Sequence, residues 1–143
     1  MNYMKRIAKK DLVIGIDGGG TKTIAILADL SGKPIKRISV GPSNPNKVGY
    51  GQAIFELKSA IKKVSRGANK NRIVSIYIAL AGSLERDVKK RQKIKNHLLE
   101  TLPEFTKLDE ILEIEGDQRA AFRSGSDRGD GIVIIACTGS IAM

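Results

Sequence analysis

Three short apolar runs separated by turns occupy the first forty residues. The runs are Leu12–Asp17, Thr23–Leu30 and Ile35–Val40, and the third alternates apolar and polar positions. Three glycines follow the first run, and Ser31-Gly32-Lys33-Pro34 separates the second from the third. Because turn residues mark both connections and the connections are short, the pattern predicts three strands in an antiparallel meander.

The next segments alternate helical and strand patterns. Apolar residues recur at helical spacing from Tyr50 to Val64, which predicts an amphipathic helix. The nearly unbroken apolar run Ile73–Ala81 is typical of a strand covered on both faces. Ser83 is a candidate cap for a second helix that runs to Leu102.

The pattern then returns to strands. Ile111–Ile114 predicts a fifth strand, Ala120–Phe122 a short helix and Gly125–Gly131 a polar loop. The apolar run Ile132–Ala136 predicts one more buried strand. A meander followed by crossover connections predicts an α/β fold with a mixed five-stranded sheet and helices packed against its faces.

The composition is that of one ordinary globular domain. The chain has 143 residues and a formal net charge of +10. The basic residues lie mainly in 58–72 and 89–95, on the faces of predicted helices. No aromatic residues are interleaved with them for base stacking, which argues against a nucleic-acid partner. No apolar stretch approaches the ~20 residues of a membrane span, so no membrane partner is expected either.

Cysteine and histidine limit the available chemistry. Cys137 and His97 are the single residues of their kinds, which excludes a disulfide within the chain and a multi-histidine metal site. His97 lies in a basic helical segment and is expected to be solvated, and Cys137 is expected to be a small buried hydrophobe. This usage is typical of a reducing, cytoplasmic setting.

The most informative motif is the turn after the first strand. Gly18, Gly19 and Gly20 carry no Cβ, so a phosphate could approach their amides closely, with Thr21 and Lys22 next in sequence. A plain hairpin would use glycine for its positive φ, but needs only one or two. A P-loop and a Rossmann fingerprint are both excluded, because a strand follows the turn instead of a helix. We therefore favour a phosphate site over a plain turn.

Two aspartates follow predicted strands. Asp17 stands beside the glycines and is a candidate for holding Mg²⁺ through water, with an Asx-type turn as the alternative role. Asp117 follows the fifth strand, where a carboxylate can accept a proton from a substrate hydroxyl that attacks phosphorus. Helix N-capping is its alternative role, and Glu115 is a rival base.

Two further loops carry candidate ligands. Thr138, Gly139 and Ser140 form a second hydroxyl-and-glycine turn, which could grip a polyphosphate from the side opposite the first turn. Ser43 and Asn44 can hydrogen-bond a polyol and stand between prolines that stiffen the loop. An ordinary surface loop explains this second pattern equally well.

Together these motifs resemble the sugar-kinase and actin superfamily, and within it the family of N-acetylglucosamine kinases and BadF/BadG/BcrA/BcrD-type ATPases. They correspond in order to a first phosphate motif, a sugar-side loop, a strand-to-glycine step, a segment with the catalytic base and a second phosphate motif. The segments that carry the resemblance are Gly15–Thr23, Gly41–Pro45, Ala79–Gly82, Gly116–Ala121 and Cys137–Ser140.

The resemblance implies a ribonuclease-H-like (actin-like ATPase) domain with sheet order 3-2-1-4-5, and ATP and Mg²⁺ held between it and a second domain. It assigns the metal to Asp17 and catalysis to Asp117 as base. The cofactor phosphates are assigned to two turns with the residues Gly18, Gly19, Gly20, Thr21, Lys22, Thr138, Gly139 and Ser140. The sugar is assigned to Ser43, Asn44, Asp117 and Thr138.

The chain departs from this family in two residues and in length. Cys137 replaces the first glycine of the second phosphate motif, and Gln118 replaces a small residue after the base. Relatives continue with a whole second domain, of which only the strand Ile132–Ala136 is represented here. That strand is expected to find no later strand to pair with. It is expected to pair with another copy or with a separately encoded second half, or to pack over the surface of the first domain.

The expected organisation has three parts: a basic N-terminal segment over 1–10, a ribonuclease-H-like domain over 11–128 and the start of a second domain over 129–143. The leading function is the N-terminal half of an ATP-dependent kinase for an amino sugar or hexose, weakly active or inactive alone. Two alternatives stay open: an activator ATPase of an acyl-CoA dehydratase or reductase, and a non-catalytic remnant that binds a ligand or partner.

Overall fold

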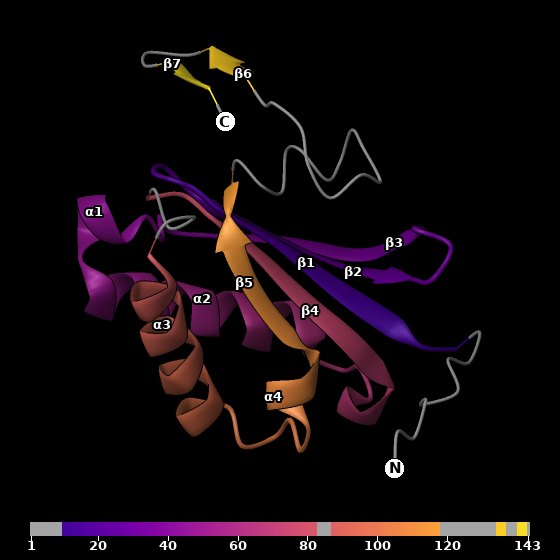
Figure 1. Ribbon diagram of the computed structural model, residues 1–143. Helices are drawn as coiled ribbons and strands as arrows, with labels where there is room; N and C mark the ends of the chain where they lie inside the picture. The colour runs from indigo at the N-terminus through magenta and orange to yellow at the C-terminus, as the bar shows by residue number, and fades with distance from the viewer. Residues whose placement is uncertain (1–9, 83–86, 118–133, 137–139, 143) are drawn as a thin grey trace.

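A mixed five-stranded sheet forms the centre of the molecule. The computed structural model describes residues 10–82, 87–117, 134–136 and 140–142. The sheet order is β3-β2-β1-β4-β5, as the sequence resemblance predicted (Figure 1). The first three strands pair antiparallel as a meander, and β4 and β5 run parallel to β1. The strands are β1 (Leu12–Gly18), β2 (Thr23–Asp29), β3 (Pro34–Val40), β4 (Ile73–Leu80) and β5 (Leu112–Gly116).

The two long helices lie on one face of this sheet (Figure 1). α2 contacts the strands of the meander, and α3 contacts β5 and α2. Three short helical segments also occur in the described part of the chain: one lies directly before α2, one before β4 and one before β5. The helices are α1 (Pro45–Val48), α2 (Tyr50–Ser65), η1 (Lys70–Arg72), α3 (Val88–Thr101) and α4 (Leu108–Ile111).

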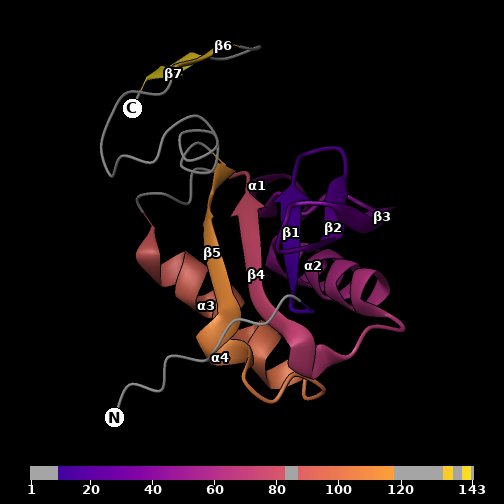
Figure 2. The ribbon, with the colours of Figure 1, turned by 90° about the vertical axis from the view of Figure 1, so that its right-hand side faces the viewer.

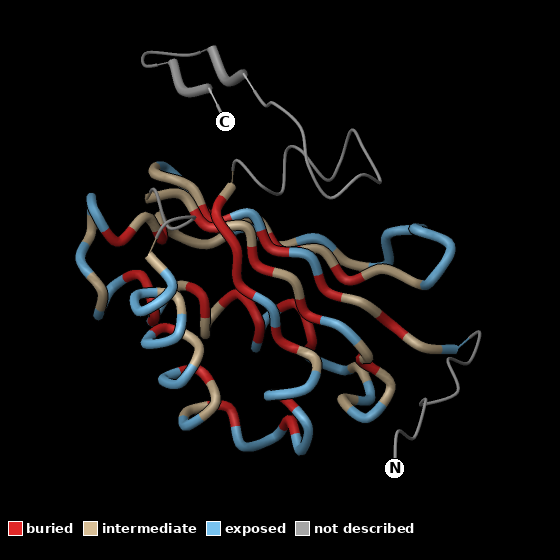
Figure 3. Tube along the Cα trace, in the orientation of Figure 1, coloured by how far each residue is buried: buried red, intermediate tan, exposed pale blue. Residues whose placement is uncertain are grey.

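The hydrophobic core fills the space between the sheet and these helices. Alternate residues of β1, including Ile14 and Ile16, point into it and are buried, because successive strand residues face opposite sides. Leu57 and Ile61 of α2 and Leu98 of α3 meet them with no exposed surface. Figure 3 shows the buried positions following the inner side of the helices and alternating along the strands.

β4 is less covered than its apolar sequence predicted. Ile76, Ile78 and Leu80 are buried toward the helices, but Tyr77 is half-buried and Ser75 is exposed. The expectation of cover on both faces is therefore met on only one face of this strand. On the second face, the Tyr77 hydroxyl donates a hydrogen bond to Glu115 of β5.

The second long helix begins later than predicted. Its N-cap is Asp87, whose side chain accepts a hydrogen bond from the Lys90 amide at 3.0 Å. The prediction that Ser83 caps this helix is wrong, because an N-cap must lie within one turn of the amides that it satisfies. Asp87 does, since α3 starts at Val88.

The C-terminal strand has a partner, contrary to the prediction. β6 (Ile134–Ala136) pairs antiparallel with β7 (Ser140–Ala142) in a two-stranded sheet of its own. The prediction missed β7 because a run of three residues is too short to show strand periodicity. The predicted helix at Ala120–Phe122 and loop at Gly125–Gly131 lie outside the described residues. Among the helices of the described part, none is long and apolar enough to cross a membrane.

Candidate functional site

The carboxyl ends of three parallel strands meet at one edge of the sheet. The register places Asp17 of β1 opposite Ala79 of β4, and Ala79 opposite Glu115 of β5. Asp117 follows β5 directly. The arrowheads of β1, β4 and β5 point to this edge, and α1 lies beside it (Figure 2). In open α/β sheets, ligands bind beyond the carboxyl ends of the strands.

The turn at this edge needs glycine because neighbouring atoms leave no room for a Cβ at two of its positions. None of Gly18, Gly19 and Gly20 is among the glycines with positive φ, so the plain-hairpin explanation fails. A Cβ on Gly18 would lie 2.5 Å from Ser43 Oγ and 2.6 Å from Leu80 Cδ1. On Gly19 it would lie 3.0 Å from the Lys22 carbonyl oxygen. The first two glycines therefore allow the turn to pack against its neighbours.

The same turn presents backbone amides outward. The Gly19 amide donates to the Lys22 carbonyl at 3.0 Å and closes the turn. Within 10–82 and 87–117, the amides of Gly20, Thr21 and Lys22 donate to no other group. Thr21 and Lys22 are exposed. Consecutive unpaired amides with an adjacent cation make a concavity that suits an anion.

Hydrogen bonds connect the loop after β3 to this turn. The amides of Ser43 and Asn44 donate to the Gly19 carbonyl at 3.0 and 3.2 Å. Thr23 Oγ1 donates to the Gly41 carbonyl at 2.8 Å and lies 2.7 Å from Ser43 Oγ. Thr23 and Ser43 both have no exposed surface. The Ser43 hydroxyl therefore fixes the loop to the turn and presents no surface to a sugar in this conformation.

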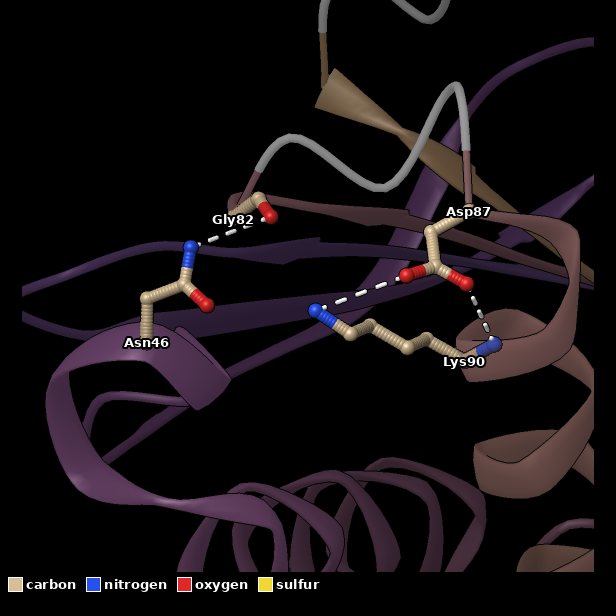
Figure 4. Close-up of polar contacts among 4 residues, drawn as sticks. All are labelled: Asn46, Gly82, Asp87 and Lys90. Carbon is tan, nitrogen blue, oxygen red and sulfur yellow. Dashed lines mark hydrogen bonds and ion pairs between the residues drawn. The ribbon is translucent and has the colours of Figure 1, made fainter.

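The neighbouring asparagines connect the same loop to the residues that follow β4. Asn44 caps α1 by accepting from the Asn46 amide at 2.9 Å, and the Asn46 side chain donates to the Gly82 carbonyl at 3.2 Å. Figure 4 shows this bond beside the Asp87 cap of α3. The Asn44 side-chain NH₂ makes no hydrogen bond within the described part of the chain. It therefore remains able to donate to a substrate hydroxyl.

The acids at the edge lie in different surroundings. Asp17 is exposed on the sheet face opposite the helices, and Asp117 is half-buried. Two strand spacings separate β1 from β5, or about 10 Å. Glu115 is buried and accepts a 2.5 Å hydrogen bond from the Tyr77 hydroxyl. Glu115 is the more buried of the two, and Asp117 follows the strand end in a half-buried position, so Asp117 is the more accessible candidate base.

The donor set fits magnesium bound through few protein ligands. Among the described residues, no three His, Cys, Asp or Glu side chains gather as a metal cluster. Mg²⁺ usually keeps several waters and takes one or two carboxylates together with substrate phosphates. An exposed carboxylate at Asp17, next to unpaired amides for those phosphates, has this character.

One candidate ligand was missed from the sequence. Lys47 of α1 lies over the glycine turn, with its Nζ 3.0 Å from the position of a Cβ on Gly20. The two residues are far apart in sequence, and only the folding of the 41–49 loop brings them together. Of the second predicted phosphate turn, Thr138 and Gly139 lie outside the described residues, and Ser140 is described only as the first residue of β7.

The fold is shared with solved sugar kinases. A ROK family glucokinase from Streptomyces griseus, solved in complex with glucose and AMPPNP, superposes with a TM-score of 0.60 at 22% identity, over 92% of this chain and 43% of that one. The sheet order and the parallel strand ends thus define an actin-like sugar-kinase fold.

The sequence gives the family. The model of the BadF/BadG/BcrA/BcrD ATPase family matches residues 14–143, and the chain belongs to this family. It is 33% identical to an N-acetyl-D-glucosamine kinase of Dictyostelium discoideum over 94% of the chain and 43% of the relative. It is 28% identical to an N-acetylmuramic acid/N-acetylglucosamine kinase of Clostridium acetobutylicum over 90% of the chain and 40% of the relative. The chain thus spans less than half the length of these curated relatives.

Proposed function

We propose that this chain forms the phosphate- and sugar-binding half of an ATP-dependent kinase that phosphorylates a hydroxyl of an N-acetylglucosamine-type amino sugar. The main support for this proposal is the glycine turn beside Asp17. Its amides at Gly20, Thr21 and Lys22 have no acceptor among the described residues. The family membership and the two curated kinases support ATP and an amino sugar as the ligand classes.

Each described residue has a separate task in this proposal. The amides of the glycine turn and Lys22 bind phosphate oxygens, and Asn44 donates its free NH₂ to a sugar hydroxyl. Asp117 accepts the proton of the attacking hydroxyl, which makes the oxygen a better nucleophile toward phosphorus. Mg²⁺ near Asp17 would neutralise phosphate charge when bound. Glu115 keeps its bond to Tyr77 and takes no proton.

The remaining contacts involve Thr138 and Gly139, which lie outside the described residues, the nearby Ser140, and a further segment for adenosine. Thr138, Gly139 and Ser140 are proposed to bind the other side of the triphosphate. We also propose that the adenosine contacts come from a further segment, either in the same chain or in a second one, and that the setting is cytoplasmic. Because positioning and exclusion of water supply most of the rate of phosphoryl transfer, the 143 residues alone are expected to be weakly active or inactive.

Asp117→Asn tests the proposal in the complete gene product, assayed together with the second chain where the adenosine contacts lie in one. Loss of the general base should reduce kcat for N-acetylglucosamine-dependent ADP release by about 10²- to 10⁴-fold and leave the KM for ATP nearly unchanged. Glu115→Gln is the matched control, which keeps an acceptor for Tyr77 and should retain most activity. A wild-type product without sugar-dependent ADP release would refute the kinase function. A loss of rate in Glu115→Gln alone would move the base to Glu115.

A further inference from the structure

The side chain of Lys47 is packed against the glycine turn. Its Nζ, Cδ and Cε lie 3.0, 3.2 and 3.3 Å from the position that a Cβ on Gly20 would occupy. No other atom lies closer to that position. The absent Cβ of Gly20 is therefore what allows the lysine to lie across the turn.

The Lys47 ammonium has no acceptor within 10–82 and 87–117. It takes part in none of the hydrogen bonds or ion pairs of that part of the chain. Two other lysines have acceptors, since Lys36 donates to the last turn of α2 and Lys95 contacts Asp109, whereas the exposed Lys62 has none among the described residues. Within these two ranges, a cation without an acceptor thus lies next to three amides without acceptors.

All of these groups are donors, and they converge from two separate segments of the chain. The turn supplies the Gly20, Thr21 and Lys22 amides, and α1 supplies the ammonium. Donors and positive charge without a matching acid attract a polyvalent anion, because hydrogen bonds from a charged donor to phosphate are stronger than neutral ones. Asp17, the nearest acid in sequence, is the next-to-last residue of β1 and is already proposed to hold Mg²⁺ beside the phosphates.

We propose that Lys47 is a phosphate ligand that completes the glycine-turn site. This half of the site would then bind a chain of phosphates without contacts to the adenine or ribose of a nucleotide. This inference rests on the proposed use of the turn as a phosphate site and adds a ligand to it. Lys47 and Asn44 lie on the same loop, and the loop is fastened to Gly19. An anion held by Lys47 therefore also stabilises the placement of the proposed sugar-side asparagine.

Binding of inorganic tripolyphosphate with Mg²⁺, followed by calorimetry, tests the inference on the 143-residue chain. Tripolyphosphate carries the phosphates of ATP without adenosine and so probes only the proposed contacts. Lys47→Met should weaken binding about tenfold or more, as expected for a hydrogen bond from a charged donor. Lys47→Arg should retain most of the affinity. Lys62→Met, which removes the same charge from an exposed position in the last turn of α2, should leave it nearly unchanged.

Gly20→Ala provides an independent variant. The three atoms nearest to its Cβ, apart from those of the adjoining residues, all belong to the end of the flexible Lys47 side chain, so the protein should fold normally while the ammonium is displaced. Its loss of affinity should be at least that of Lys47→Met, because the added Cβ also narrows the approach of phosphate to the turn amides. The double variant should lose little more than Gly20→Ala alone, because the ammonium is already displaced in that variant. Thermal unfolding of each variant confirms that the fold is retained.

The outcomes separate the inference from the proposed function. Wild-type binding with an unchanged Lys47→Met variant would overturn the role of Lys47 and leave the glycine turn as the phosphate site. Equal losses in Lys47→Met and Lys62→Met would reduce the effect to net charge and overturn it as well. A wild-type chain that does not bind tripolyphosphate would overturn both the inference and the proposed phosphate site.

Discussion

Two turns of the same meander use their polar groups in opposite ways. The turn between β2 and β3 closes on itself: Asp29 Oδ1 accepts from the Ser31 amide, the Ser31 hydroxyl and the Lys33 amide at 2.8, 2.5 and 3.1 Å. Its glycine, Gly32, has a φ of 84°. The turn between β1 and β2 has glycines without positive φ and leaves three amides without an acceptor among the described residues.

The difference shows what distinguishes a connecting turn from a binding turn. In the first, glycine supplies a backbone angle and an acidic side chain satisfies the local donors. In the second, glycine supplies space, which Ser43, Leu80 and Lys47 fill from other parts of the chain. The close packing therefore belongs to Gly18 and Gly19 at the start of the turn, and the amides without an acceptor among the described residues belong to Gly20, Thr21 and Lys22.

The largest effect is expected from Gly18→Ala. The added Cβ would lie 2.5 Å from Ser43 Oγ and 2.6 Å from Leu80 Cδ1, both in packed surroundings. We expect a loss of about 3 kcal/mol in the free energy of unfolding, as for strong overpacking. Gly15→Ala is the matched control in the same strand, because no atom lies within 4 Å of its Cβ position. Urea unfolding measures both, and equal values would contradict the packing role of Gly18.

A smaller loss is expected when the buried hydroxyl pair is broken. Thr23→Val keeps the side-chain shape, leaves the Gly41 carbonyl without its donor and removes the hydroxyl partner of Ser43 Oγ, which should cost about 1–3 kcal/mol. Ser31→Ala in the other turn removes a hydroxyl that is exposed and should stay within about 0.5 kcal/mol of wild type. Chemical unfolding of the two variants compares them. A greater loss in Ser31→Ala would reverse the proposed difference between the turns.

The smallest effect is a pH dependence in the connecting turn. The Ser31 hydroxyl, followed by the Lys33 amide, lowers the pKa of Asp29 below its ordinary value. A carboxyl with a lowered folded-state pKa stabilises the fold above its unfolded-state pKa, and this contribution is lost as the pH falls through the folded value. Asp29→Asn should therefore lower the Tm slightly at neutral pH, and the difference should disappear in strong acid. A difference that grows in acid would contradict the assigned direction.

The sheet was predictable from sequence because its signals are local. Alternation and turn residues gave β1, β2 and β3 to within one residue at each end, and helical spacing gave α2 to within one residue. The order 3-2-1-4-5 came from the family resemblance and is confirmed. Short elements such as α1 and β7 were missed, because four or three residues carry too little periodicity to be recognised.

The candidate site was predictable only where its residues adjoin strand ends. Asp17 and the glycine turn follow from β1 alone, and the parallel register then brings Asp117 to the same edge. Lys47 could not be found in this way, since its place over Gly20 depends on how the 41–49 loop folds back. The burial of Ser43 depends on the same loop and on Leu80 of β4.

Amide chemical shifts measured during a titration with Mg²⁺ and tripolyphosphate test the central claim most directly. Both turns are observed in one spectrum of the unmodified chain, so each serves as the reference for the other. Saturable shifts at Gly20, Thr21 and Lys22, with Ser31, Gly32 and Lys33 unchanged, are the predicted result. Shifts of equal size in both turns, or none at the glycine turn, would contradict the account.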